Sequence, residues 1–219
     1  MKRHFPLRRL LLPLLLALLA GLAACSKPDR PTVSLYLAVE RGDIDQLERH
    51  LYWGTPVDRP FPNGRQPLHE AAAKGRAVMV KMLLKHGVPV DARDREGHTP
   101  LELAILNGRT QVADVLIRAG AHFDPSALLL EVARQNVTDR DLVRYLKRKG
   151  ADLEARDAEG NTPLLIATAH GNHRLVHHLI QEGADVNARN AAGETPLTIA
   201  RRRGPPELVQ LLLNNGAIE

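Results

Sequence analysis

The stretch Gly183-Ala-Asp-Val-Asn-Ala-Arg-Asn-Ala-Ala-Gly-Glu-Thr-Pro-Leu197 links the end of one repeating unit to the start of the next. Its first glycine is one of six that follow one another at intervals of 33, 33, 30, 33 and 33 residues: Gly54, Gly87, Gly120, Gly150, Gly183 and Gly216. A proline followed by leucine stands 20 residues before four of these glycines, at Pro67, Pro100, Pro163 and Pro196. Such a period predicts stacked copies of one small unit, a solenoid.

The third unit shows how each copy is built. Thr99 is placed to cap a helix, and Pro100 follows at the first helical position, where a missing N–H costs nothing. Apolar residues continue at helical spacing to Gly108, which can adopt the left-handed conformation that ends a helix. A second helix with one apolar face runs to Gly120. We expect the same pattern at Thr162-Pro163 with Gly171 and at Thr195-Pro196 with Gly204. Helices this short are marginal alone, so the units must bury their apolar faces against one another.

These segments resemble the ankyrin repeat. The resemblance is carried by Thr99-Pro-Leu-Glu-Leu-Ala104, Gly160-Asn-Thr-Pro-Leu164 and Gly183-Ala-Asp-Val-Asn-Ala188, which are similar to the family's Gly-x-Thr-Pro-Leu-His and Gly-Ala-Asp-Val-Asn-Ala signatures. It implies an all-α fold, an ankyrin-repeat solenoid of about six helix-turn-helix repeats with protruding β-hairpin loops. The domain is expected at 33–219, with repeats at about 33–61, 62–94, 95–124, 125–157, 158–190 and 191–219.

The fourth unit, 125–157, departs from the pattern. Phe123-Asp-Pro-Ser126 replaces the usual fingertip, the loop tip between units, and also replaces the Thr-Pro entry. Val137 stands where the other units have glycine. Counting from Leu130 to Gly150 gives 20 steps, against 19 in the other units, which predicts one residue inserted between its helices. We expect this unit to form the least stable junction of the stack.

The first 24 residues form a separate segment. Residues 1–9 carry four basic residues and no acidic one, and residues 10–24 are uncharged and rich in leucine. The apolar run is shorter than the roughly 20 residues that span a bilayer as a helix, so residues 1–24 are predicted to be an export signal. The segment ends at Leu22-Ala23-Ala24-Cys25, which resembles the bacterial lipobox. The resemblance implies cleavage before Cys25, diacylglycerol on its thiol and acylation of its amine.

Cys25 is the only cysteine of the chain, which excludes a disulfide within it. Several acyl chains make a firm anchor, since each buried methylene contributes about 0.8 kcal/mol. Residues 25–32 are expected to be the lipidated N-terminus and a short polar tether. Ser26 favours sorting to the outer membrane. We therefore expect the protein in the bacterial cell envelope, lipid-anchored to the outer membrane and facing the periplasm.

The formal net charge of +5 belongs largely to the export signal. Without the four basic residues of that segment, 26 of the 30 Lys and Arg remain against 25 Asp and Glu, a net charge of +1. The mature chain therefore gives no support for a nucleic-acid partner, because such binding needs an excess of basic residues. The three Phe, three Tyr and one Trp also offer few stacking platforms.

The sequence contains no recognisable catalytic constellation. His69-Glu70 begins like the zinc-protease motif His-Glu-x-x-His, but the fifth residue is Ala73. The family resemblance makes His69 a structural imidazole that forms hydrogen bonds with neighbouring backbone. His170, His173 and His177 could offer imidazoles to zinc or copper, but no carboxylate or thiol completes the set, and a solvated helix face is the favoured interpretation. We expect no enzyme, no cofactor, no metal and no small-molecule substrate.

Charged residues gather on loop tips and helix ends. The acidic pairs Asp94/Glu96 and Asp157/Glu159 are interpreted as solvated turn residues or partner contacts. Arg201-Arg202-Arg203 ends a predicted helix, where positive charge favours the helix dipole. The alternative for this run is contact with an acidic partner or with lipid headgroups.

Ankyrin arrays generally bind proteins through their fingertips and the exposed positions of their first helices. The resemblance assigns this role to Asn63, Arg65, Lys74, Arg95, Glu96, His98, Asn107, Glu159, Asn161, His170, Glu194, Arg202 and Arg203. The main hypothesis is a monomeric, lipid-anchored scaffold for protein–protein interaction that faces the periplasm. The alternative is an inhibitor or immunity protein that neutralises a toxin or enzyme in the bacterial envelope. A third hypothesis, an enzyme or metal chaperone that uses the histidine group, is less favoured.

Overall fold

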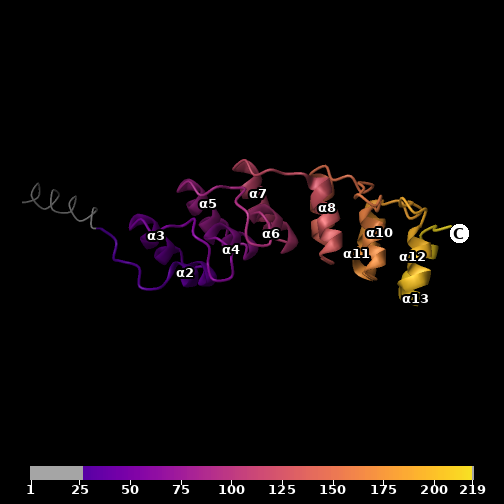
Figure 1. The fold of residues 1–219 in the computed structure, drawn as a ribbon, viewed down its shortest axis with the longest axis horizontal. Helices are drawn as coiled ribbons and strands as arrows, with labels where there is room; N and C mark the ends of the chain where they lie inside the picture. The colour runs from indigo at the N-terminus through magenta and orange to yellow at the C-terminus, as the bar shows by residue number, and fades with distance from the viewer. Residues whose placement is uncertain (1–26, 219) are drawn as a thin grey trace, which may run out of the picture.

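The computed structural model describes residues 27–218, so the predicted export signal and Cys25 lie outside the described residues. Twelve helices in residues 27–218 follow one another as pairs in one elongated row (Figure 1), which confirms the all-α class. The first helix of each pair is called the inner helix: α2 (Leu35–Arg41), α4 (Pro67–Ala73), α6 (Pro100–Leu106), α8 (Pro125–Arg134), α10 (Pro163–Ala169) and α12 (Pro196–Arg203). The second is the outer helix: α3 (Ile44–Tyr52), α5 (Ala77–Lys85), α7 (Thr110–Arg118), α9 (Arg140–Arg148), α11 (His173–Glu182) and α13 (Pro206–Asn214).

The inner helices begin where the sequence predicts. Thr99, Thr162 and Thr195 are N-caps, and the hydroxyl of each accepts a hydrogen bond from the amide three residues further on. Proline occupies the first turn of α6, α10 and α12. Because proline has no N–H to satisfy at that position, these entries fix the helix start at little cost.

Glycine ends most of the helices as expected, with one exception. Gly108 and Gly171 both have φ of 67°, the left-handed conformation that glycine adopts without strain. Gly204 is instead extended, with φ −90° and ψ 163°. The prediction for Gly204 is wrong because Pro205 follows it, and a residue before proline is pushed into the extended region. Glycine is still needed there, since an added Cβ would lie 2.8 Å from the carbonyl oxygen of Ala200.

The loop between α8 and α9 also corrects the prediction. Asn136, with φ of 56°, occupies the left-handed position that was assigned to Val137, because asparagine tolerates this conformation and a β-branched residue does not. Asp139 caps α9 three residues after Asn136, whereas Asn172 caps α11 directly after Gly171. The loop therefore carries two inserted residues instead of the expected one.

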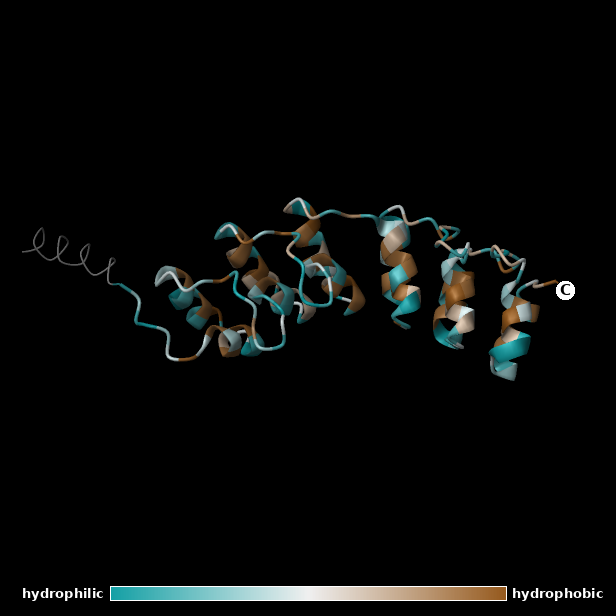
Figure 2. Ribbon diagram, in the orientation of Figure 1, coloured by the Kyte–Doolittle hydropathy of each residue, from teal (hydrophilic) through white to brown (hydrophobic). Residues whose placement is uncertain are grey.

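The core runs without a break through the whole stack. One cluster of buried apolar residues extends from Leu35 to Ala217 and includes one leucine at the same place in each inner helix from α4 onward: Leu68, Leu101, Leu129, Leu164 and Leu197, none more than 1% exposed. Figure 2 shows both hydrophobic and hydrophilic residues on the helices, as expected for helices that bury one face. Burying such a leucine contributes about 1.5–3 kcal/mol, so the interfaces between pairs hold the row together.

The loops between pairs differ from the β-hairpins that the resemblance implies, since residues 27–218 contain no strand. Each regular fingertip closes as a hydrogen-bonded turn, as where the amide of Asp94 donates to the carbonyl of His98 at 3.0 Å. Within residues 27–218, neighbouring fingertips share one backbone–backbone hydrogen bond, in which the amide of Ala191 donates to the carbonyl of Glu159 at 3.1 Å. These few bonds do not form a ladder. Among the described residues, no helix is long and apolar enough to span a membrane.

Candidate partner-binding surface

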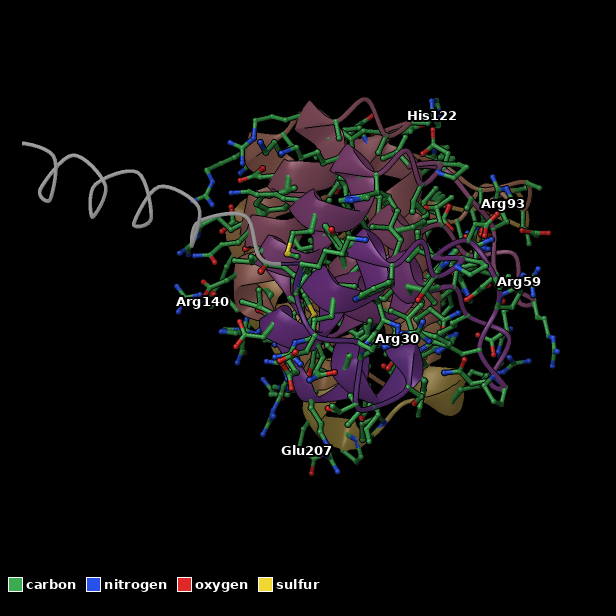
Figure 3. The ribbon with its side chains drawn as sticks, turned by 90° about the vertical axis from the view of Figure 1, so that its left-hand side faces the viewer. Arg30, Arg59, Arg93, His122, Arg140 and Glu207 are labelled. Carbon is green, nitrogen blue, oxygen red and sulfur yellow. The ribbon has the colours of Figure 1, made fainter. Side chains whose placement is uncertain are left out.

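The predicted partner-binding residues form two rows. The first row is on the fingertips: Asn63, Arg65, Arg95, Glu96, His98, Glu159, Asn161 and Glu194. The second row is at the C-terminal ends of the inner helices: Lys74, Asn107, His170, Arg202 and Arg203. Figure 3 looks along the stack from its N-terminal end and shows the loop residues Arg59 and Arg93 on one side and Arg140 of outer helix α9 on the opposite side. The fingertips and the outer helices therefore face different ways.

One acid or amide side chain shapes each regular fingertip. Oδ1 of Asp94 accepts hydrogen bonds from the amides of Glu96 at 3.0 Å and His98 at 2.9 Å. Asp157 and Asn190 make the same two bonds, to the amides two and four residues further on. Such local bonds favour a turn over a regular element. In each of these fingertips, the residues two and four positions after the acid or amide are therefore held in place through their backbone.

The fingertip of Asp157 also has a perturbed acid. Burial raises the pKa of Asp157, but hydrogen bonds from the amides of Asn161 and Glu159 and the charge of Arg134 outweigh it and hold the pKa below its ordinary value. A carboxylate that accepts backbone N–H bonds is favoured in its charged form. Asp157 therefore stays ionised at neutral pH and continues to accept these hydrogen bonds.

Asp94, Glu96 and His98 form the one group among the described residues whose ligand atoms all lie within 4.8 Å, as a metal site would need. The guanidinium of Arg65 already lies beside both acids, 3.6 Å from Asp94 and 3.7 Å from Glu96. It supplies the positive charge that the two carboxylates need. The group is therefore explained by an ion pair between neighbouring fingertips, and Arg65, Glu96 and His98 are brought together as predicted contact residues.

In the second row, Lys74 is already paired. Its ammonium lies 2.9 Å from Glu40 of α2 and 3.6 Å from Glu70 of its own helix. The hydrogen bond from Lys74 lowers the pKa of Glu40, and the same bond raises the pKa of Lys74. Both groups are largely in contact with water, so the pair contributes little to stability. Lys74 is thus accessible to a partner but held in place.

The C-terminal end of this surface is basic and exposed. Arg202 forms an ion pair with Glu194 of the adjoining fingertip, and Arg203 is exposed beside it. A hydrogen bond from Asn190 and then one from Arg202 lower the pKa of Glu194. His170 is exposed at the end of α10, so it belongs to the same face as Arg202 and Arg203. This end can contact an acidic group of a partner.

A groove that the sequence did not predict lies between α6 and α8. It encloses about 460 Å³ and has a floor of Leu101, Ala127 and Leu128. The groove opens because the loop from Ala121 to Asp124 is too short to form a fingertip and α8 begins directly after it. Its walls carry Arg93, Glu96, His98, Glu102, His122, Asp124, Glu131 and Arg134. Only Glu96 and His98 of these belong to the predicted set.

The signal for this groove was present in the sequence. Phe123-Asp-Pro-Ser126 marks the missing fingertip, but residue spacing does not show whether neighbouring side chains fill the space it leaves. Pockets of this size, with an apolar floor and polar walls, are typical of binding sites. The groove is therefore added to the two rows, and together they make up the candidate surface.

The histidine group does not converge on a metal site. His170, His173 and His177 are absent from the metal-sized clusters of residues 27–218. His177 instead lies beside His178, with 5.9 Å between ring centroids. Burial and the nearby charges of His177 and Arg140 lower the pKa of His178. The group therefore lies on the outer face of α11, away from the candidate surface except for His170.

The structural interpretation of His69 is confirmed. Its Nε2–H donates to the carbonyls of Ala92 at 2.9 Å and His98 at 3.1 Å, and its side chain is fully buried. Burial lowers the pKa of His69, which keeps the imidazole neutral. His69 therefore ties α4 to the following fingertip and is not available for catalysis.

Comparison with known proteins places the chain in a family. Residues 35–127 and 129–218 each match the family model described as "Ankyrin repeats (3 copies)". The human ASB11 ankyrin repeat domain is 26% identical over 85% of this chain and 85% of its own, with a TM-score of 0.66. The ankyrin repeat domain of Bcl-3 is 25% identical over 87% of this chain and 89% of its own, with a TM-score of 0.64.

A third similar structure is a chain from the complex of the Bd0816 predatory endopeptidase of Bdellovibrio bacteriovorus with immunity protein Bd3460. It is 24% identical over 84% of this chain and 99% of its own, with a TM-score of 0.63, and this likeness shows the fold alone. The search among curated proteins finds no match. Ankyrin repeats are typically binding scaffolds without catalytic activity. Since the family match covers nearly all the described residues, this chain is a member of the ankyrin-repeat family.

Proposed function

We propose that the protein is a lipid-anchored scaffold of the bacterial envelope that binds a protein partner along its fingertips and inner-helix ends. The observation that carries the proposal is the groove between α6 and α8, which interrupts the two rows with an apolar floor and charged walls. Membership of a family of interaction domains supports the same function. Fold analogy alone does not name the partner.

The charges of the groove suggest what it holds. Its walls carry four carboxylates, on Glu96, Glu102, Asp124 and Glu131, against two guanidiniums, on Arg93 and Arg134. With neutral histidines, the lining residues carry a formal charge of −2, and of −1 when Arg65 beside Glu96 is included, so a basic side chain is favoured. Lysine and arginine also carry an apolar stem that can lie on the leucine floor. We therefore propose that a lysine or arginine of the partner enters the groove.

Site-specific photo-crosslinking in living cells tests the binding surface. A photoreactive amino acid at Ala127, which is exposed in the groove, should give a crosslinked adduct with a partner. The matched control carries it at Lys85, exposed at the end of outer helix α5, and should give none. Adducts from Lys85 alone would place the interface on the outer helices and reject the proposal.

Replacement of Glu131 tests the chemistry of the groove. Glu131→Arg reverses one wall charge and should weaken the adduct formed from Ala127, because like charges repel a basic side chain. Glu207→Arg, an exposed change at the start of α13, is the control and should leave the adduct unchanged. Equal adducts from both variants would argue against a basic occupant.

The anchor is tested separately. Cys25→Ser removes the only thiol, so the protein should move from the membrane fraction to the soluble fraction. Separation of inner and outer membranes should then find the unchanged protein in the outer one, as Ser26 favours. Continued membrane association of Cys25→Ser would reject the lipid anchor without affecting the binding surface.

A second candidate function is an inhibitor or immunity protein for an enzyme of the envelope. The observation that favours it is the fold shared with a chain of the endopeptidase–immunity protein complex, over 84% of this chain and 99% of that one. Deletion of the gene should then make the cells sensitive to an enzyme of their own envelope. The Glu131→Arg protein should fail to restore resistance while Glu207→Arg restores it. Full resistance in the deletion strain would favour the scaffold.

A further inference from the structure

We infer that the N-terminal end of the stack rests directly on a lipid bilayer, with Tyr52 and Trp53 at the level of the headgroups. The inference depends on the lipid anchor of the proposed function and adds the protein surface that meets the membrane. It is carried by residues 28–33, named here the N-terminal strap, which lie against α3.

Trp53 holds the first half of the strap. Its indole N–H donates to the carbonyls of Pro28 at 3.1 Å and Asp29 at 3.2 Å. The guanidinium of Arg30 lies 5.1 Å from the centre of the indole ring, a cation–π contact. Asp29 also lies 3.7 Å from the guanidinium of Arg49. The chain is thereby fixed to α3 from Pro28 onward.

The second half of the strap is tied to the same helix. The amide of Thr32 donates to Oε1 of Gln46 at 2.9 Å. Nε2 of His50 lies 2.9 Å from the carbonyl of Val33, and His50 is buried at 7% exposure. Contacts along the whole strap mean that residues 28–33 do not act as a flexible spacer between the anchor and the helices.

The strap sets the distance between anchor and protein. Cys25 precedes Pro28 by three residues, and three extended residues span at most about 10 Å. Acyl chains on Cys25 would therefore hold Pro28 and α3 at the bilayer surface. Only residues 26 and 27 separate Cys25 from the strap, so the stack cannot move far from the membrane.

The surface presented there suits the membrane interface. Tyr52 is 53% exposed and Trp53 is 38% exposed, and their rings meet edge to face with 5.6 Å between centroids. Tyrosine and tryptophan concentrate at the boundary between headgroups and hydrocarbon because each has an apolar body and a polar tip. Arg30 of the strap, which lies over the Trp53 ring, and Lys27, which directly precedes the strap, are exposed and can contact lipid phosphates.

The charges at the N-terminal end of the stack predict which lipid headgroups it can contact. Three cations, Lys27, Arg30 and Arg49, are balanced by three acids, Asp29, Asp45 and Glu48, in and around the hollow that Pro28 and Tyr52 line. With no net charge, attraction to anionic lipids contributes little. Contact is therefore expected on phosphatidylethanolamine as well as on anionic membranes.

The strap also orients the binding surface. It lies at one end of the row, and the C-terminus lies at the other (Figure 1). Figure 3 looks at this end and places Arg30 in front of the stack, with the loop residues Arg59 and Arg93 to the side. With this end on the membrane, the row of repeats projects away from it. The groove between α6 and α8 then remains open to a partner.

Trp53 is the only tryptophan, so its fluorescence reports on this contact alone. The acylated mature protein, residues 25–219, is reconstituted in phosphatidylethanolamine vesicles that contain a headgroup spin-labelled lipid. We expect strong quenching of Trp53 emission by that lipid and a loss of quenching by iodide in the water. Protein that sediments with the vesicles yet shows no lipid quenching would overturn the inference while leaving the anchor intact.

A spacer variant provides the control for proximity. A flexible Gly-Ser segment inserted between Ser26 and Lys27 keeps Cys25 and the strap but separates them. It should still sediment with the vesicles and should lose the lipid quenching of Trp53. Retained quenching would show that the strap does not set the distance and would overturn the inference. Failure of the unchanged protein to sediment would reject the anchor itself, and the inference with it.

Discussion

The junction between the α6/α7 pair and the α8/α9 pair differs from the junction between the α10/α11 pair and the α12/α13 pair. At the second junction the fingertips meet, since Asn190 donates to the side chain of Asn161 at 3.0 Å and the amide of Ala191 donates to Glu159. At the first junction the fingertip is missing, and α6 meets α8 over less of its surface than α10 meets α12. On the outer side of this junction, two side chains of the α8/α9 pair contact Asp114 of α7.

The outer contacts at the first junction are polar. The hydroxyl of Tyr145 in α9 donates to Asp114 in α7 at 2.8 Å, and Lys149 lies 2.8 Å from the same carboxylate. Burial and the hydrogen bond to Asp114 raise the pKa of Tyr145, so the hydroxyl remains a donor. The comparison shows that a junction without a fingertip still has side-chain contacts between its outer helices, while the missing fingertip leaves the groove open on the inner side.

The largest effect on stability is expected from a core residue of α10, which belongs to the regular junction between the α10/α11 and α12/α13 pairs. Leu164→Ala should lower the free energy of unfolding by about 2–5 kcal/mol, because it removes a fully buried side chain and leaves a cavity. Leu129→Ala, at the same position of α8, should fall toward the lower end of that range, since less of α8 is covered by α6. Urea denaturation measures both. An unchanged curve for Leu164→Ala would mean that the register of the units is misplaced.

The next effect concerns the polar contacts of the irregular junction. Tyr145→Phe keeps the ring and removes the hydrogen bond to Asp114, which should cost about 1–2 kcal/mol. Hydrogen exchange should find residues 125–150 the least protected part of the stack and should find them exchanging faster still in the variant. If residues 125–150 were the best protected segment, the weak-junction interpretation would be wrong.

A smaller effect is expected in the loop that joins α8 to α9. Asn136→Ala should cost about 1 kcal/mol, because alanine is strained in the left-handed conformation. Asn136→Gly should cost nothing, since glycine adopts this conformation freely, as Gly171 does in the regular unit. Thermal unfolding compares the two variants. Equal melting temperatures would show that the loop does not constrain this junction.

The smallest expected effect is a pH dependence of stability that comes from His69, in the regular N-terminal part of the stack. Burial lowers the pKa of His69 in the folded state below its ordinary value of about 6.5. The unfolded chain then binds the proton more readily, so stability present above about pH 6.5 should be lost as the pH falls through the lowered pKa. The His69→Gln variant should not lose this part of its stability as the pH falls. Identical pH profiles of denaturation for the two proteins would contradict it.

The regular features could be predicted because they depend on local chemistry. Thr99, Thr162 and Thr195 start helices through their own hydroxyls, and Gly108 and Gly171 end them through their own backbone freedom. Neither effect needs a distant partner. The burial of His69 against the backbone was implied by the family resemblance and is confirmed.

The irregular features are of two kinds. Two are local and were missed: Gly204 is extended because Pro205 follows it, and Asn136 is left-handed in place of Val137 because asparagine tolerates that conformation. The other two depend on packing. The groove depends on how far α6 and α8 separate, and the strap depends on where Trp53 meets the chain before α2. Residue spacing along one unit carries none of these distances.

The sequence by itself determined that this protein is a row of paired helices, since the repeat period, the capping residues and the glycines act within a few residues of each other. It also placed most of the candidate surface, because the same positions recur in every unit. Only the tertiary structure decided that Arg65 joins two fingertips, that a groove replaces a third, and that the N-terminal strap lies on α3. These depend on side chains of different units meeting in space, and the packing of one unit on the next fixes that meeting.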